Sequence, residues 1–215
     1  MSGKIALITG ASRGFGAAVA ENLAANGYHV IALARTVGGL EELDDRIQSA
    51  GGSATLVPLD ICDDEGLKRL CLSIHKRWGK LDLWVHSAIF AGPQSPVGHV
   101  PLSDWEKTLA INIRATQRLV EMVEPLLKNG GGTAVLPTDE MAGAKFFASY
   151  GAAKAAQKAI WQSWAAETVR IGPKVLTFAP KPMPTALRAR FYPGEDRAAL
   201  APIKSEAARL VNSLT

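Results

Sequence analysis

Six apolar, β-branched runs recur along the chain, and a stretch with helical periodicity separates each run from the next. The runs are apolar at nearly every position, which is the pattern of strands buried on both faces of a parallel sheet. Helices must then cover both faces, and right-handed crossovers favour a doubly wound α/β fold. The expected strands are residues 4–9, 29–34, 54–59, 81–88, 133–137 and 174–179.

Capping residues indicate where several helices begin and end. Gly27 is expected to end the first helix, and Asp63 or Asp64 is expected to begin the third. Ser103, followed three residues later by Glu106, has the pattern of a capping box at the start of a further helix.

A proline-rich segment, residues 180–200, interrupts this alternation of strands and helices. It is expected to form a loop with a short helix over the carboxyl edge of the sheet, where substrate lids are often found. An amphipathic helix follows within residues 203–214. Because the pattern shows no repeat and no second core, residues 1–215 are predicted to form a single domain.

Composition excludes several classes of protein. With 47% hydrophobic and 20% charged residues, the chain has ordinary globular usage. Its net charge of +4 is small and dispersed, so no nucleic-acid partner is expected. No apolar run reaches the ~18 residues of a membrane span, and no secretory leader is recognisable, so we expect a cytoplasmic protein without a membrane partner. Cys62 and Cys71 lack a second pair, which predicts ordinary thiols and no metal site.

A glycine-rich loop lies between the first expected strand and the first expected helix. Gly10 permits a tight turn, Gly14 lets the backbone approach a pyrophosphate, and Gly16 lets the helix pack closely. Because a strand precedes the loop and a helix follows it, the pattern is strong evidence for a dinucleotide site. The other loop residues expected to contact the dinucleotide are Ser12, Arg13 and Phe15.

The end of the second expected strand indicates which dinucleotide is bound. A fold specific for NAD places an acid there to bind the ribose 2′-hydroxyl, whereas this chain has Arg35. Arg35 and Arg13 together supply two guanidinium groups for a 2′-phosphate. The sequence therefore predicts NADP(H) in preference to NAD.

Taken in order, the motifs resemble those of the short-chain dehydrogenase/reductase family over essentially the whole chain, and they are most similar to a divergent bacterial branch. The resemblance implies a Rossmann-type sheet with strand order 3-2-1-4-5-6 in which the usual final strand of the family is missing. The motifs that carry it are TGASRGFG at residues 9–16, Leu59-Asp60 after the third strand, Asn112 in AINIRAT, and YGAAK from Tyr150 to Lys154.

The resemblance also implies roles for individual residues. Asp60 and Ile61 are expected to contact the adenine. Tyr150 is expected to be the general acid/base at the substrate oxygen, with Lys154 holding the nicotinamide ribose and lowering the tyrosine pKa from its usual ~10. Asn112 is expected to support a water chain behind the lysine.

Departures from the family pattern gather on the nicotinamide side. After the fourth strand, where the family has Asn-Asn-Ala-Gly, this chain has His86, Ser87, Ala88 and Ile89. The last three are expected to contact the cofactor. With Ile89 in place of glycine, either the loop has shifted or the nicotinamide end is crowded. His86 is expected to be a hydrogen-bonded residue at a strand end, not a catalytic one.

Two further departures involve charged residues. The hydroxyl donor of the family falls on Asp139 when counted from the fifth strand, although Thr138 is an alternative occupant. An ionised aspartate can only accept hydrogen bonds and opposes a developing alkoxide. After the sixth strand, the Pro-Gly of the family becomes Pro180-Lys181, of which Pro180 is expected to contact the cofactor, and we expect Lys181 to compensate the charge of Asp139.

Two functions are consistent with these residues. The first is an NADP(H)-dependent oxidoreductase that moves hydride between nicotinamide and a carbonyl or alcohol, with Tyr150, Lys154, Asn112 and Asp139 in the catalytic site. The second is an NADP(H)-binding pseudoenzyme, a regulatory or structural module with little turnover. The resemblance further implies a homodimer formed through the helices that contain Asn112 and Tyr150. In that case Trp161 and Trp164 belong either to the interface or to the core.

Overall fold

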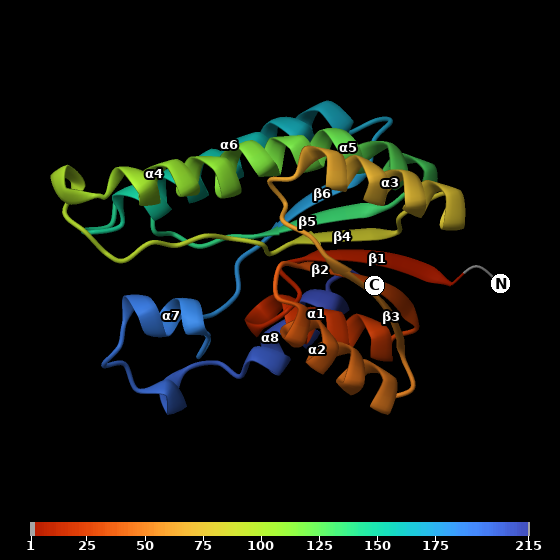
Figure 1. The fold of residues 1–215 in the computed structure, drawn as a ribbon, viewed down its shortest axis with the longest axis horizontal. Coiled ribbons are helices and arrows are strands. Elements are labelled where there is room, and N and C mark those ends of the chain that lie inside the picture. The colour runs from red at the N-terminus through yellow and green to blue at the C-terminus, as the bar shows by residue number, and fades with distance from the viewer. Residues whose placement is uncertain (1–2, 215) are drawn as a thin grey trace.

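A parallel sheet of six strands forms the centre of the computed structural model, which describes residues 3–214 (Figure 1). The strand order is β3-β2-β1-β4-β5-β6, and each strand is parallel to its neighbours. This order confirms the predicted doubly wound fold. The strands are β1 Lys4–Thr9, β2 Tyr28–Ala34, β3 Ser53–Pro58, β4 Leu83–His86, β5 Thr133–Pro137 and β6 Lys174–Phe178.

Helices cover both faces of the sheet, as the continuous apolar runs predict. Helices α1, α2 and α8 pack on one face and α3, α5 and α6 on the other (Figure 1). The helices are α1 Gly14–Ala25, α2 Val37–Ser49, α3 Asp64–Trp78, α4 Leu102–Thr108, α5 Ala115–Gly130, α6 Ala148–Thr168, α7 Ala186–Phe191 and α8 Ile203–Asn212. A π-helical segment, Leu109–Arg114, joins α4 to α5, and 3₁₀ turns occur at Val97–His99 and Arg197–Ala199.

The tryptophans of α6 belong to the core. Trp161 and Trp164 both pack against the ring of Trp84 on β4, and the indole N–H of Trp161 donates to the carbonyl oxygen of Leu176 at 2.9 Å. Both side chains are almost fully buried. Of the two alternatives, the core is therefore confirmed, and these residues do not form a surface for dimerisation.

Most helix boundaries agree with the capping signals, with one exception. Helix α1 ends just before Gly27, which has a φ of 80°, and Asp63 caps α3 by accepting the N–H of Gly66 at 2.9 Å. The capping box at Ser103 was wrong, because α4 already begins at Leu102 after Pro101. Proline fixes φ close to a value that suits the residue before a helix, which places Ser103 inside the first turn.

The segment of residues 180–200 lies beyond the carboxyl ends of the strands and apart from both helical layers (Figure 1). It contains α7 and a 3₁₀ turn, close to the expected loop with a short helix. Arg188 and Glu195 hold the segment together through two hydrogen bonds of 2.6 and 2.5 Å. Arg190 attaches it to the rest of the fold by donating to the carbonyl oxygen of Ala91.

Among the helices of residues 3–214, none combines the length and the apolar character needed to cross a lipid bilayer.

Candidate active site

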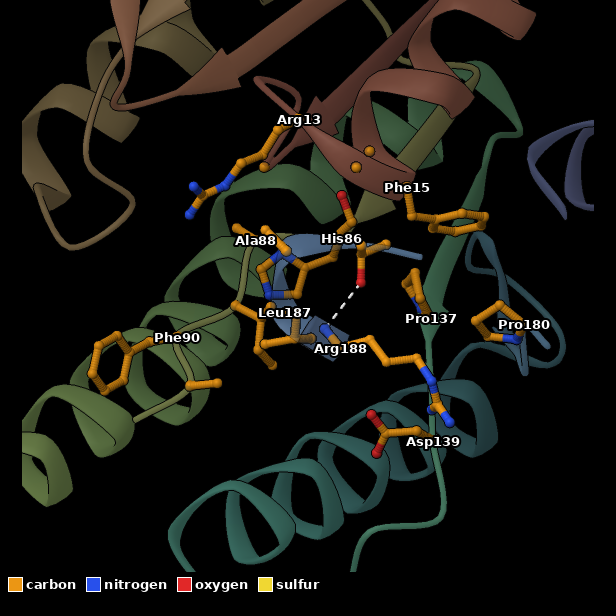
Figure 2. Close-up of a pocket in the computed structure, with 18 of the residues that line it drawn as sticks. Arg13, Phe15, His86, Ala88, Phe90, Pro137, Asp139, Pro180, Leu187 and Arg188 are labelled. Atoms are coloured by element: carbon orange, nitrogen blue, oxygen red, sulfur yellow. Dashed lines mark hydrogen bonds between the residues drawn. The ribbon is translucent and has the colours of Figure 1, made fainter. Parts of the chain in front are cut away.

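A cavity of about 680 Å³ opens at the carboxyl ends of the strands (Figure 2). Its walls come from the glycine loop, the ends of β2, β4, β5 and β6, the first turns of α6, and α7. All fifteen residues predicted to contact the cofactor line this cavity, as does Asp139. Segments far apart in the sequence are thus brought together as the strand order predicts.

The glycine loop leaves space that a dinucleotide can fill. A Cβ atom on Gly10 would lie 2.7 Å from the backbone nitrogen of Ala88, and one on Gly16 would lie 2.4 Å from the carbonyl oxygen of Gly10. These two glycines let β1, α1 and the β4 loop approach one another. Gly14 has a φ of +60°, a backbone conformation that favours glycine, and an ideal Cβ there would only be in ordinary contact with Thr185 at 3.7 Å. This cradle fits a pyrophosphate.

Two arginines lie at the end of the cavity expected to hold adenosine. Arg35 Nη1 is 3.6 Å from Asp60 Oδ2, but the side chains are 62% and 43% exposed, so water screens this ion pair. Arg13 extends from the glycine loop toward the opening (Figure 2), and no acid within residues 3–214 forms a salt bridge with it. Both guanidinium groups are therefore available to a phosphate.

At the opposite end, Tyr150 meets a carboxylate. The hydroxyl of Tyr150, in the first turn of α6, donates to Asp139 Oδ2 at 2.5 Å. The other candidate, Thr138, is buried and donates instead to the carbonyl oxygen of Phe178 at 3.4 Å. Asp139 therefore occupies the place next to the tyrosine, and the alternative occupant does not.

Aromatic side chains enclose Tyr150. Phe147 and Phe191 pack edge-on against its ring, with ring centroids 6.3 and 5.0 Å away, and only 4% of Tyr150 is exposed. Burial raises the pKa of the phenol, and the charge of Asp139 and the hydrogen bond to it raise the pKa further. The expected lowering of the pKa by Lys154 is not seen, because burial and the carboxylate of Asp139 set the shift and Lys154 is not among its causes.

Lys154 lies one turn beyond Tyr150 on the same face of α6. Its Nζ donates to the carbonyl oxygen of Pro137 at 2.7 Å. Burial lowers the pKa of Lys154, and the charge of Asp139 opposes that shift. The ammonium group is thus positioned by β5 and compensates part of the carboxylate charge.

Asn112 lies behind the wall of the cavity, in the π-helical segment between α4 and α5. Its side-chain oxygen accepts the N–H of Phe90 and its amide donates to the carbonyl oxygen of Phe90, both at 2.8 Å. Asn112 therefore fixes the loop after β4, and its role in a water chain stays a prediction.

His86 is the centre of a buried hydrogen-bond network whose geometry sets its tautomer. Thr116 Oγ1 donates to the carbonyl oxygen of Asn112 at 2.7 Å and accepts from Gln157 Nε2 at 3.0 Å. Its remaining lone pair must then accept from His86 Nε2–H at 2.9 Å. His86 Nδ1 is consequently the acceptor for the hydroxyl of Thr9 at 2.8 Å.

This network confirms that His86 is a hydrogen-bonded residue at a strand end. Burial, together with the charge of Lys154, lowers the pKa of His86 to about 3. The neutral imidazole therefore connects β1 and β4 to the helices behind the sheet, without titrating near neutral pH.

The expected compensation of Asp139 by Lys181 was wrong. No ion pair between these two described residues occurs in the structure. The backbone N–H of Lys181 instead donates to Glu206 Oε2 at 2.9 Å, and Arg209 Nη2 donates to the same oxygen at 2.6 Å. Glu206 is buried in the first turn of α8, so it attaches the loop after β6 to the helical layer formed by α1, α2 and α8.

Sequence reasoning missed Phe191, Glu206 and the partners of His86. Phe191 lies in the proline-rich segment, whose path over Tyr150 no periodic pattern shows. Glu206 and Arg209 are three residues apart on an amphipathic helix, which is the only sequence signal that their pairing gives.

Comparison with known proteins identifies the family. Residues 4–196 match the family described as short chain dehydrogenase. The chain belongs to the short-chain dehydrogenase family, which is a family of oxidoreductases. A short chain dehydrogenase structure from Pseudomonas syringae has a TM-score of 0.90 at 28% identity, covering 94% of this chain and 85% of that one. A Shigella flexneri short chain dehydrogenase complexed with NADP has a TM-score of 0.87 at 28% identity, covering 94% and 86%.

Curated members of the short-chain dehydrogenase family extend the comparison. D-threitol dehydrogenase of Mycolicibacterium smegmatis is 29% identical over 99% of this chain and 90% of that protein. Fatty acyl-CoA reductase of Acinetobacter baylyi is 32% identical over 79% of this chain. The match spans 59% of the length of that reductase.

Replacement of Asp139 by asparagine is expected to lower the pKa of Tyr150, because the amide removes the charge and the anionic acceptor while burial remains. Phenolate absorbance during an alkaline titration measures this pKa, and Tyr150→Phe separates Tyr150 from the other two of the three tyrosines. In the wild type the folded pKa is raised, so the free energy of unfolding should fall as the pH rises above ~10. An unchanged titration in Asp139→Asn would contradict this coupling.

Proposed function

We propose that the protein is an NADP(H)-dependent oxidoreductase that moves hydride between nicotinamide and a carbonyl or alcohol carbon. The observation that carries the proposal is that one cavity is lined by Arg13 and Arg35 at one end and by Tyr150 and Lys154 at the other. When bound, the nicotinamide supplies or accepts the hydride. The chain's own residues bind the cofactor, orient the substrate and hold a proton.

The preference for NADP(H) rests on charge. Arg13 and Arg35 are exposed, lie near the end of β2 and have no strong acidic partner, which suits a dianionic 2′-phosphate. The Shigella flexneri relative is complexed with NADP, and a related short chain dehydrogenase structure from Escherichia coli, 27% identical with a TM-score of 0.89, is complexed with NADPH.

Residues on the substrate side have distinct roles in this proposal. Tyr150 holds the proton that is exchanged with the substrate oxygen, and Lys154 supplies a fixed positive charge beside it. Asn112 holds the backbone of the β4 loop against the nicotinamide end. The segment of residues 180–200, which places Phe191 over Tyr150, serves as the substrate lid. The printed activities of the relatives range from a threitol to an acyl-CoA, so they name no single substrate.

The hydrogen bond from Tyr150 to Asp139 favours a second candidate, a module that binds NADP(H) with little turnover. A tyrosine that donates to a carboxylate is not free to donate to a substrate oxygen. Loss of one oxyanion donor costs about 10²–10³ in rate, which weakens an enzyme without abolishing activity.

Replacement of Arg35 by serine is expected to weaken NADPH binding by about 10- to 100-fold, because one charged hydrogen bond is lost. NADH, which has no 2′-phosphate, should bind as before. Titration of nucleotide fluorescence measures both affinities. Arg170→Ser, which removes an exposed arginine that does not line the cavity, is the matched control. An equal loss for both nucleotides would show that Arg35 does not distinguish them.

Replacement of Tyr150 by phenylalanine is expected to lower NADPH-dependent reduction of carbonyl substrates by about 10²-fold or more, because general acid catalysis is lost. NADPH affinity should change little, since the phosphate sites are intact. The measurement is NADPH oxidation over a panel of aldehydes and ketones. Tight NADPH binding without any turnover that depends on Tyr150 would favour the module instead.

A homodimer is expected through α4 and the following π-helical segment. Leu102, Trp105 and Leu109 form one stripe there and are 70%, 37% and 37% exposed. Trp105→Glu should convert the dimer to a monomer, as measured by light scattering over a range of concentrations. Leu72→Glu on α3 replaces another exposed apolar residue and should leave the dimer intact. A wild-type mass that equals one chain at all concentrations would contradict the proposal.

A further inference from the structure

One oxygen of the Asp139 carboxylate lacks a hydrogen-bond partner. Oδ2 accepts the hydroxyl proton of Tyr150, whereas Oδ1 is buried and no donor within residues 3–214 reaches it. A buried carboxylate oxygen without a donor is costly, and such groups in proteins are usually satisfied. Asp139 lines the cavity, so its negative charge is close to any molecule bound there.

The cationic side chains around the cavity do not donate a hydrogen bond to Asp139. Lys154 donates to the backbone of Pro137, and Arg188 is held by two hydrogen bonds to Glu195. Lys181 lies next to Glu206, whose pKa is lowered mainly by the hydrogen bond from Arg209 and also by the charge of Lys181. Among residues 3–214 no cation thus forms an ion pair with Asp139, and Lys154 compensates its charge only through space.

This arrangement suits a carbonyl substrate poorly. A carbonyl oxygen becomes an alkoxide as hydride arrives, and the carboxylate of Asp139 opposes that negative charge. The proton of Tyr150 is also directed toward Asp139. A protonated imine differs on both counts, because it carries a positive charge and forms no anion that needs the proton of Tyr150.

We propose that the preferred substrate of this site is an imine bound as its iminium cation, with Asp139 as the specificity-determining residue and an amine as the reduced product. This inference rests on the proposed nicotinamide chemistry and changes the preferred reacting group of the substrate from C=O to C=N.

The reaction balances without an additional proton. The iminium carbon gains a hydride, one proton with two electrons, from NADPH, which is oxidised to NADP⁺. The π electron pair of the C=N bond becomes the nitrogen lone pair, and the nitrogen keeps its proton. Tyr150 therefore keeps its own proton throughout, in agreement with the raised pKa of the phenol.

The surroundings of Asp139 are suited to a cation with an apolar body. Phe147, Phe191 and the ring of Tyr150 form an apolar cluster with Ala91, and Ile89 and Leu187 pack against it. Aromatic faces attract cations, and the effect is larger where water is excluded. A carboxylate that accepts a hydrogen bond from a tyrosine within an aromatic cluster is a combination that selects organic cations over neutral alcohols.

Equilibrium binding tests this inference with a matched pair of probes. Tetrahydroisoquinoline is a cation at neutral pH, and α-tetralol is a neutral alcohol with a similar bicyclic skeleton. We expect the wild type to bind the amine at least about tenfold more tightly than the alcohol, by calorimetry, because a hydrogen bond to a charged group is gained. In Asp139→Asn, which preserves the shape of the side chain, this ratio should fall to about one.

Glu140→Gln is the matched control. It removes a carboxylate at the next residue, where the side chain is exposed and pairs with Lys158 at 3.3 Å, and it should preserve the binding ratio. Equal binding of the two probes by the wild type would overturn the inference. So would a ratio that Asp139→Asn leaves unchanged, and so would an equal fall of the ratio in Glu140→Gln.

Turnover separates this inference from the proposed function. We expect NADPH oxidation to be faster with dihydroisoquinoline than with α-tetralone, and Asp139→Ser to shift the preference toward the ketone. Failure of the protein to bind NADPH would reject the proposed function. The ratio of the amine and alcohol affinities, measured on the cofactor-free protein, would still test the inference. The protein could reduce the ketone in a reaction that depends on Tyr150 and yet bind the amine no more tightly than the alcohol. This result would support the proposed function and overturn the inference.

Discussion

The hydrogen bond between Thr9 and His86 joins β1 to β4 at the point where the order of the strands reverses. Chain segments leave these two strand ends in opposite directions, so a crevice forms between them. The bond keeps the ends close enough that only glycine fits at residue 10 against the backbone of Ala88. Through Thr116 the same imidazole connects to the helical segment that holds Asn112. Both halves of the cavity are therefore positioned from one buried, uncharged network.

The two halves differ in how they treat charge. At the adenosine end the cations are exposed and weakly paired, so a phosphate can bind them at little desolvation cost. At the other end Asp139, Tyr150 and Lys154 are held by short hydrogen bonds in surroundings poor in water. Electrostatic interactions are stronger there, and a charge without a partner costs more free energy. In the proposed function, the first half selects the dinucleotide and the second half selects the charge of the substrate.

The sequence predicted the parts of the structure that depend on periodicity and on local turns. Continuous apolar runs such as residues 29–34 identified the strands, the family resemblance implied their order, and the glycine loop indicated the dinucleotide cradle. The sequence alone could not decide whether Thr138 or Asp139 lies next to Tyr150, because the β5–α6 loop is irregular and includes a positive φ at Phe146. The partner of Lys181 and the cover that Phe191 forms over Tyr150 depend on long-range packing of a proline-rich segment. No local pattern contains that information.

The charge of the Asp139–Tyr150–Lys154 group follows from its geometry. If the phenol keeps its proton, the carboxylate and the ammonium leave the group neutral overall, but the two charges are separated. The negatively charged Asp139 lines the cavity, while the ammonium of Lys154 is turned toward the backbone of β5. A neutral group with its negative end toward the substrate has a directional preference that its net charge does not show. Substitution of a single hydroxyl donor by a carboxylate can therefore reverse the polarity presented to the substrate while the cofactor half of the fold is unchanged.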